Sequence, residues 1–184
     1  SPNMLALSKT LNRSVEHHLG DMRTVRLGKT VDAVLIHDAV SYLLTEADLQ
    51  NTYATAAVHL RRGGVLLVAP DWVSGTFPDG WVYTWERKQG DIEVEIEEVM
   101  VDQDPTDTQV ESTYTYTIRR NGVTEVEQDT HVTGLFPENT WVRLMEQAGF
   151  SVEMVPLPPN EGGYGSWLFI GVYRGSDSRG GECA

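Results

Sequence analysis

The fold class of this chain follows from one apolar run, Val31-Asp32-Ala33-Val34-Leu35-Ile36. A nearly continuous run of this kind is typical of a strand buried on both faces of a parallel sheet. A helix follows, with Thr45 as its N-cap, Asp48 in the capping-box position and Gly63-Gly64 at its end. Residues 65–69 then form a second buried strand. Strand, helix and strand at this spacing predict a βαβ unit, and therefore an α/β fold with a parallel sheet.

The same alternation of helix and strand flanks this unit on both sides. Ser1 is an N-cap followed by Pro2 at the first helical position, which predicts an N-terminal helix. Residues 15–19 are a short strand candidate. The other expected elements are a helix over residues 137–148 and strands over residues 152–156 and 167–174.

Residues 81–132 have a different pattern, which predicts an inserted antiparallel sheet. Residues 92–96 alternate between apolar side chains and glutamates, as in a strand with one wet face. The alternation breaks at Glu97-Glu98, which predicts a β-bulge. Asn121-Gly122 is a strong signal for a two-residue hairpin turn.

The charge balance excludes several classes of partner. The 184 residues carry 14 Lys and Arg against 27 Asp and Glu, a formal net charge of −13. We therefore expect no nucleic-acid partner and no anionic membrane surface. The single cysteine excludes an intrachain disulfide and a Cys-rich zinc or iron–sulfur site. No apolar run is long enough to span a bilayer. We expect a cytoplasmic protein.

Several common catalytic motifs are absent from the sequence. It contains no GxSxG elbow, P-loop, HExxH or CxxC pattern. His17-His18 lies in the predicted short strand, where successive side chains point to opposite faces. We therefore expect ordinary strand residues there and no metal site.

Three segments in order carry a resemblance to a known family. They are Leu19-Gly20-Asp21-Met22-Arg23, residues 31–38 and Leu60-Arg61-Arg62-Gly63-Gly64-Val65. Together they resemble the second half of a class I S-adenosylmethionine-dependent methyltransferase. The resemblance implies that S-adenosylmethionine is the cofactor. It also implies that Asp21 and Met22 lie at the adenine, and that His37 and Asp38 lie at the methionine part.

The resemblance covers the chain up to about Arg174, and its layout is similar to that of the amino-sugar N-methyltransferases. It implies an α/β fold with a Rossmann-like methyltransferase sheet, incomplete at its N-terminus, and an inserted antiparallel sheet. The expected domains are a core over residues 1–80 and 133–174 and an inserted sheet over residues 81–132. A flexible tail over residues 175–184 is expected after them.

The sequence departs from the family pattern in two places. The family's Gly-rich loop, its first strand and its ribose-binding acid would all precede Ser1. We therefore expect the C-terminal portion of a larger protein, with an open apolar edge along residues 31–36. Either the other half is disordered or lost, or another chain covers this edge. The histidine that the amino-sugar enzymes carry at about Leu43 is also replaced.

The catalytic candidates are His37, Tyr42 and His131. A neutral imidazole at the carboxyl end of a buried strand could take a proton near neutral pH, although His37 could also merely cap the strand or orient the cofactor. Trp72 and Tyr42 are the candidates for substrate contact. The other aromatic residues of the inserted sheet fit core packing better than a substrate cage. Its acidic residues fit either a solvated outer face or the steering of a cationic substrate.

Two functions of different classes remain open at this point. The first is an enzyme that transfers a methyl group to an N or O nucleophile of a small molecule, as a homodimer. In it, the inserted sheet would cover the substrate site or pair two subunits. The second is a non-catalytic binding or dimerisation module derived from the same fold, with the inserted sheet as its interface.

Overall fold

The computed structural model describes residues 1–158 and 166–175, and its core is a four-stranded sheet in the order β1-β2-β8-β7. The strands are β1 (Val31–His37), β2 (Leu60–Ala69), β7 (Phe150–Pro156) and β8 (Trp167–Tyr173). β1 and β2 run parallel, whereas β8 is antiparallel to both β2 and β7. The predicted α/β class with a parallel strand pair is confirmed.

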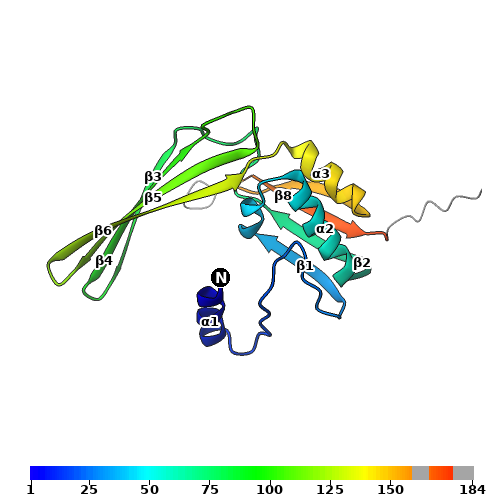
Figure 1. The fold of residues 1–184 in the computed structure, drawn as a ribbon, viewed down its shortest axis with the longest axis horizontal. Coiled ribbons are helices and arrows are strands. Elements are labelled where there is room, and N and C mark those ends of the chain that lie inside the picture. Colours follow the sequence, from blue (N-terminus) through cyan, green and yellow to red (C-terminus); the bar gives the residue numbers. More distant parts are fainter. Residues whose placement is uncertain (159–165, 176–184) are drawn as a thin grey trace, which may run out of the picture.

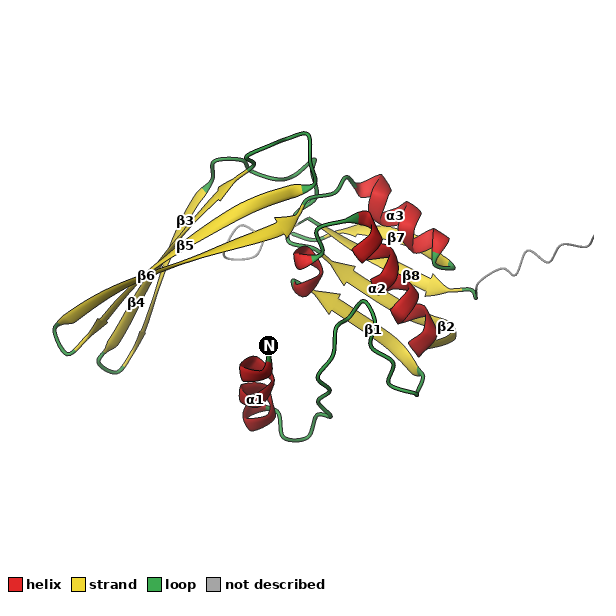
Figure 2. Cartoon of the chain, viewed as in Figure 1, coloured by secondary structure: helices red, strands yellow, loops and turns green. Residues whose placement is uncertain are grey.

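Two helices, α2 (Glu46–His59) and α3 (Glu138–Gln147), lie on one face of this sheet (Figure 2). The predicted cap of α2 is confirmed, because the Thr45 hydroxyl accepts a hydrogen bond from the Asp48 backbone N–H at 3.1 Å. Burying one large apolar side chain contributes about 1.5–3 kcal/mol, so this layer holds the core together. The largest buried side chains of the layer include Tyr53, Trp141, Phe136, Phe169, Leu49 and Leu66.

The second sheet consists of β3 (Val82–Gln89), β4 (Ile92–Val101), β5 (Gln109–Arg120) and β6 (Val123–Gly134), in that order. Figure 1 shows it projecting from one end of the core as a long twisted sheet, and we call it the arm. All its neighbouring strands are antiparallel. The predicted Asn121-Gly122 turn is confirmed, since both residues have the positive φ (50° and 79°) that a two-residue turn requires.

The predicted bulge at Glu97-Glu98 is wrong, because β4 pairs with β5 in an unbroken register. By alternation, Glu98 faces the same side of the arm as Ile96 and Met100, and its side chain is only 1% exposed. Tyr114 lies opposite on β5 and donates its hydroxyl to the Glu98 carboxylate at 2.7 Å. The apolar alternation therefore breaks because an acid occupies an inward position, and not because the strand gains a residue.

The predicted end of the second helix at Gly63-Gly64 is also wrong. α2 ends at His59, and β2 begins directly at Leu60. Arg61 lies in β2 and forms an ion pair with Asp32 on the neighbouring strand at 2.6 Å. The β1–β2 register is irregular at this point, and Gly63 has a φ of 84° that favours glycine.

Residues 15–19 form no strand, contrary to the prediction. An isolated strand leaves its backbone groups without a ladder, and no other described strand pairs with this segment. The two histidines have separate partners. His17 bonds to the Ser8 hydroxyl at 2.9 Å, and His18 lies 2.8 Å from the Glu16 carboxylate.

β1 is the outermost strand of the core sheet, as the resemblance led us to expect. The prediction that its run is buried on both faces is wrong in this structure, since Leu35 is 65% exposed. The predicted N-terminal helix is confirmed as α1 (Pro2–Leu11), with Ser1 at its N-cap, but it buries none of its residues.

Within residues 1–158 and 166–175, no helix is long and apolar enough to cross a membrane. The same part of the chain holds no group of three or more His, Cys, Asp or Glu side chains that could bind a metal ion. The predicted tail lies outside the described residues after Gly175, and the domain boundaries at residues 80 and 133 stay predictions.

The junction of arm and core depends on Gly134, the last residue of β6. A Cβ there would lie 2.1 Å from the Leu43 carbonyl oxygen and 2.7 Å from the Phe136 ring. We expect Gly134→Ala to lower the free energy of unfolding by about 2 kcal/mol or more, because two backbone segments must separate. Urea unfolding followed by circular dichroism measures this change.

Gly75→Ala is the matched control for that substitution. A Cβ at Gly75 would meet only the end of the flexible Glu138 side chain, at 3.3 Å. We expect a change below about 1 kcal/mol. Equal unfolding free energies for the two variants would contradict the proposed role of Gly134.

Candidate active site

A pocket of about 700 Å³ lies where β1 and β2 end, and the base of the arm forms its opposite wall. In open α/β sheets, ligands bind in the crevice at the carboxyl ends of the strands. We call this cavity the outer pocket. Its polar lining includes His37, Asp38, Tyr42, Asp71 and Ser166 from the core, and Tyr114, Tyr116 and His131 from the arm.

The end of β1 positions the core side of this pocket. His37 is the last residue of the strand, and its Nδ1 lies 2.8 Å from Oδ1 of Asp38. Asp38 has a φ of 49°, a left-handed conformation that is uncommon outside glycine and costs free energy. It turns the chain into the short helix η1 (Ala39–Tyr42), which places Tyr42 at the pocket.

The arm reaches this site through backbone contacts at its base. The Leu135 N–H donates to the Thr108 carbonyl oxygen at 2.8 Å, and the Thr108 hydroxyl donates to the Leu44 carbonyl oxygen at 3.0 Å. Close approach of Gly134 to Leu43 completes this junction. Residues near the base of β6 are therefore held against η1.

The result is a hydrogen-bonded chain of three side chains across the junction. Tyr42 Oη lies 2.7 Å from His131 Nδ1, and His131 Nε2 lies 3.2 Å from Asp129 Oδ2. The two partners assign the tautomer: Nε2 carries the proton and donates to Asp129, and Nδ1 accepts from the Tyr42 hydroxyl. The Tyr114 ring packs against His131 with centroids 5.0 Å apart and holds the imidazole in place.

Three titratable groups of this pocket have a pKa raised mainly by burial: Asp71, Tyr42 and Tyr116. Burial raises the pKa of the Asp71 carboxyl from 3.8 to about 6; the Ser41 hydroxyl opposes this rise and the nearby Asp38 adds to it. Burial also raises the pKa of Tyr42, with the charges of Asp71 and Asp129 adding to the effect. Tyr42 therefore keeps its proton near neutral pH and donates it in a hydrogen bond.

A smaller cavity of about 40 Å³ adjoins the outer pocket, and we call it the inner recess. The two cavities share four lining residues, so Tyr42 and His131 of the hydrogen-bonded chain lie at the boundary between them. These shared residues are Tyr42, Asp71, Tyr114 and His131. The recess is also lined by Trp72, Phe77, Glu98 and Met100.

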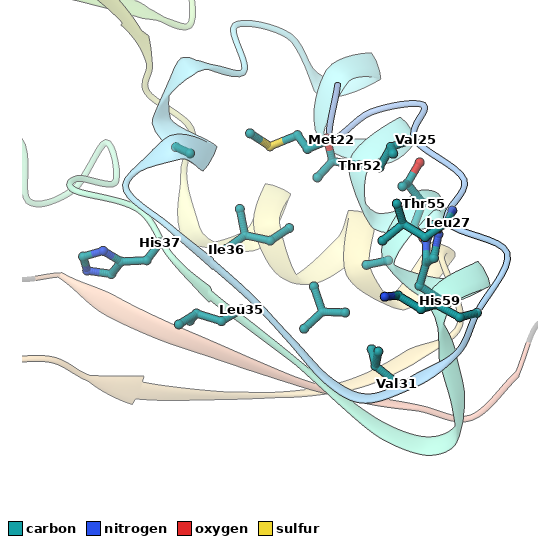
Figure 3. A pocket seen from close by; sticks show the side chains of 14 residues that line it. Met22, Val25, Leu27, Val31, Leu35, Ile36, His37, Thr52, Thr55 and His59 are labelled. Carbon is teal, nitrogen blue, oxygen red and sulfur yellow. The ribbon is translucent and has the colours of Figure 1, made fainter. Parts of the chain in front are cut away.

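A third cavity, of about 360 Å³, runs along β1 beside α2, and most of its lining is apolar (Figure 3). Met22, Leu35 and Ile36 contribute to its lining, and His37 lines both this cavity and the outer pocket. We call it the apolar pocket. The Thr52 hydroxyl is buried in its wall and bonds to no other described group, which leaves a polar atom for a ligand.

α2 holds the segment that forms the rim of the apolar pocket. Arg23 forms ion pairs with both Asp21 and Asp48, each at 2.7 Å. The Leu27 N–H donates to Nε2 of the buried His59 at 2.8 Å. These contacts fix the Gly-Asp-Met segment beside β1 without any strand pairing. The carboxylate of Asp21 is bound to Arg23 in this arrangement.

The structure brings four of the predicted site residues together in the outer pocket. They are His37, Asp38, Tyr42 and His131. Met22 lies in the apolar pocket and Trp72 in the inner recess, whereas Asp21 lines none of the three cavities. The catalytic and binding roles of all seven residues stay predictions.

Sequence reasoning missed four polar residues of the site. Asp71 had a usable signal, because it lies two residues beyond the carboxyl end of a strand. Tyr116 belongs to an aromatic series for which core packing was the favoured interpretation. Nothing in the sequence links Asp129 to His131 beyond their spacing on one strand face, and Glu98 stands in a run of glutamates.

Comparison with known proteins gives a consistent result. No family model matches the chain. It is 33% identical over 174 residues to dTDP-3-amino-3,4,6-trideoxy-alpha-D-glucopyranose N,N-dimethyltransferase of Streptomyces venezuelae, covering 94% of this chain and 70% of that protein. It is 29% identical to dTDP-3-amino-3,6-dideoxy-alpha-D-glucopyranose N,N-dimethyltransferase of Streptomyces fradiae, covering 94% of this chain and 66% of that protein.

Solved structures are similar over the same extent. Streptomyces venezuelae DesVI matches with a TM-score of 0.83 at 30% identity, over 94% of this chain and 71% of DesVI. CalS10, an amino pentose methyltransferase from Micromonospora echinaspora solved with bound S-adenosylmethionine, matches with a TM-score of 0.79 at 27% identity, over 93% of this chain and 70% of that one. Both sheets of this chain therefore have counterparts in one recurring architecture.

The raised pKa of Asp71 predicts a specific pH dependence of stability. A carboxyl with a pKa of about 6 in the folded state and 3.8 when unfolded binds more protons when folded between these values, so stability falls as pH rises through this window. Asp71→Asn removes that loss. From pH 5 to pH 8, the variant should gain about 1 kcal/mol of unfolding free energy relative to the unsubstituted protein.

Urea unfolding of both proteins at the two pH values measures this difference. Asp91→Asn removes an exposed carboxyl in the turn between β3 and β4 and serves as the control, with no relative gain expected. A pH dependence of Asp71→Asn parallel to that of the unsubstituted protein would show that burial does not shift this carboxyl.

Proposed function

Because this chain belongs to the S-adenosylmethionine-dependent sugar N-methyltransferases, we propose that it transfers methyl groups to the amino nitrogen of an amino sugar. The relatives that it matches act on deoxyamino sugars linked to dTDP, according to their names. The observation that supports this reading best is the outer pocket, which joins core and arm at the carboxyl end of β1. The non-catalytic alternative is disfavoured, since the relatives are enzymes.

The described residues fit one part of the cofactor, S-adenosylmethionine. An adenosine group would be held in the apolar pocket by Met22, Leu35 and Ile36, with the buried Thr52 hydroxyl as a hydrogen-bonding group. The cofactor supplies a methyl group on a positively charged sulfonium. His37 lies between this pocket and the outer one, so it is the candidate for orienting cofactor and acceptor relative to each other.

The chain of Tyr42, His131 and Asp129 is the best-supported candidate for proton removal. An amine must lose a proton to be nucleophilic, and it loses one again after each methylation. Tyr42 can accept this proton as it passes its own to Nδ1 of His131, 2.7 Å away. Asp129 stabilises the resulting imidazolium, the role that a carboxylate has in a catalytic triad. Most of the rate would still come from positioning.

Mass spectrometry of the acceptor tests the function directly. The protein is incubated with S-adenosylmethionine and three acceptors: a dTDP-linked deoxyamino sugar, the same sugar without its nucleotide, and the hydroxyl analogue. We expect one or two methyl groups on an amine acceptor and none on the hydroxyl analogue. Transfer to none of the amines would contradict the proposed function.

Tyr42→Phe tests the proposed proton path. It should lower kcat about tenfold or more at neutral pH, with recovery at higher pH where the amine is already neutral. The KM for S-adenosylmethionine should not change. Tyr173→Phe is the matched control, because Tyr173 lies on β8 against Phe150, away from the site. A kcat loss without any change in the pH profile would assign Tyr42 a purely structural role.

The protein is further proposed to act as a homodimer in the cytoplasm, on a small molecule and not on nucleic acid or membranes. The single cysteine supports a cytoplasmic location, and the net charge of −13 supports the absence of a nucleic-acid partner. The arm supports the dimer, because its outer strands expose Val82, Val123 and Val126 by half or more. Sedimentation equilibrium at micromolar concentration should give twice the chain mass, and the mass of one chain would contradict the dimer.

A further inference from the structure

The proposed proton path of Tyr42, His131 and Asp129 gives no role to the other residues that line the inner recess. Its volume of about 40 Å³ exceeds the roughly 10–15 Å³ that one water needs, so it has room for a few non-hydrogen atoms. It lies directly behind Tyr42 and His131, which line it together with the outer pocket. A group that enters from the outer pocket therefore passes the hydrogen-bonded chain first.

Two carboxyl groups from different elements meet at this recess. Glu98 comes from the middle of β4, is 1% exposed and accepts the Tyr114 hydroxyl at 2.7 Å. Asp71 lies two residues beyond the end of β2, and its N–H donates to the Ser41 hydroxyl at 3.2 Å. None of the described residues that line the recess is Lys or Arg. Two carboxyls in a confined, poorly hydrated space favour a positive charge between them.

Aromatic rings form part of the remaining wall of the recess, together with Met100, Ser112 and Thr133. Trp72 meets Phe77 edge to face, with centroids 6.4 Å apart and planes at 87°, and it meets Trp81 in the same way at 6.0 Å and 90°. Trp81 contacts Trp72 but does not itself line the recess, whereas the Tyr114 ring lines it beside Glu98. Ring faces attract methylated ammonium groups, because their partial negative charge meets a weakly hydrated cation.

We propose that the inner recess binds the acceptor's amino nitrogen, and that Asp71 and Glu98 stabilise the positive charge which appears on it during methyl transfer. This inference rests on the proposed function and names the group that the site recognises: a primary or N-methylated alkyl amine. The rings accommodate the added methyl groups, and the carboxyls select an amine over a hydroxyl.

The charge balance of the reaction explains the selection. The nitrogen lone pair forms the new N–C bond while the S–C bond of the sulfonium breaks, which leaves a neutral thioether and a positive nitrogen. The positive charge therefore moves toward Asp71 and Glu98 in the transition state. Fixed carboxylates at the point where charge develops lower the barrier, and they do so more strongly in a desolvated site. The surplus proton on nitrogen then leaves through Tyr42 to His131.

Binding of a small ammonium ion tests the recess without any sugar. The probe is dimethylammonium chloride, followed by tryptophan fluorescence and by saturation-transfer NMR. Ethanol is the neutral probe with the same number of non-hydrogen atoms, and potassium chloride controls for ionic strength. We expect dimethylammonium to bind at least about tenfold more tightly than ethanol, and to inhibit methyl transfer competitively against the amine acceptor but not against S-adenosylmethionine.

Glu98→Gln is compared with Glu97→Gln, which removes the same charge from the opposite, exposed face of β4. Glu98→Gln should weaken dimethylammonium binding about tenfold and raise the acceptor KM, while Glu97→Gln should leave both unchanged. Equal effects of the two variants, or equal binding of dimethylammonium and ethanol, would overturn the proposal. If Glu98→Gln does not fold, two other measurements test the proposal. They are dimethylammonium binding by Asp71→Asn, and the comparison of dimethylammonium with ethanol on the unsubstituted protein.

The two proposals fail in different ways. If amines are methylated but dimethylammonium binding and acceptor KM do not respond to Glu98→Gln, the recess is not the amine site and the proposed function stands. If dimethylammonium binds with the expected dependence on Glu98 but no amine is methylated, the cation site stands and the proposed function is wrong.

Discussion

The backbone contact between Gly134 and Leu43 is the constraint on which the candidate site depends. A hydrogen atom in place of a side chain lets β6 cross η1 closely enough for His131 to reach Tyr42. Without that approach, the outer pocket would lose its arm-side wall and the inner recess would not close. The hydrophobic cluster contains no residue of the arm strands, and the cavities lie between this core and the base of the arm. The site is therefore a property of the junction, and the stability of the junction sets how well the reacting groups are positioned.

Local sequence signals predicted much of the fold because they act over a few residues. The cap at Thr45, the turn at Asn121-Gly122 and the apolar runs of the core strands each depend on near neighbours, and the structure contains all three elements. The errors arose where a distant partner decides the outcome. Residues 15–19 have strand propensity, but a strand forms only against another strand. The first residues after His59 extend because β1 lies alongside, which no helix-stop signal reports.

The site was less accessible to sequence reasoning, for the same physical reason. His37 and Asp38 could be placed because parallel strands bring their carboxyl ends to one edge of a sheet. The pairing of Tyr42 with His131 spans 89 positions and depends on how the arm crosses the core. The glutamates of β4 also differ in a way that alternation hides: neighbours along the strand face opposite sides, so one acid meets solvent while the next is buried. Net charge alone cannot separate these two environments.

His37 lines both the apolar pocket and the outer pocket, so it lies between an apolar part and an acidic part of the site. This arrangement fits the movement of charge in the proposed methyl transfer. On one side lies the apolar pocket, whose lining offers little to stabilise a charge. On the other side lie the carboxyls of Asp38 and Asp71, with Glu98 beyond them in the recess. In the proposed reaction, a positive charge that starts on sulfur and ends on nitrogen would move from the apolar side toward the carboxyls. Such an arrangement stabilises the transition state more than the ground state, and only this difference in stabilisation accelerates a reaction. The arm supplies the buried carboxyl of Glu98, so in the proposed reaction it would be part of the catalytic environment as well as a cover.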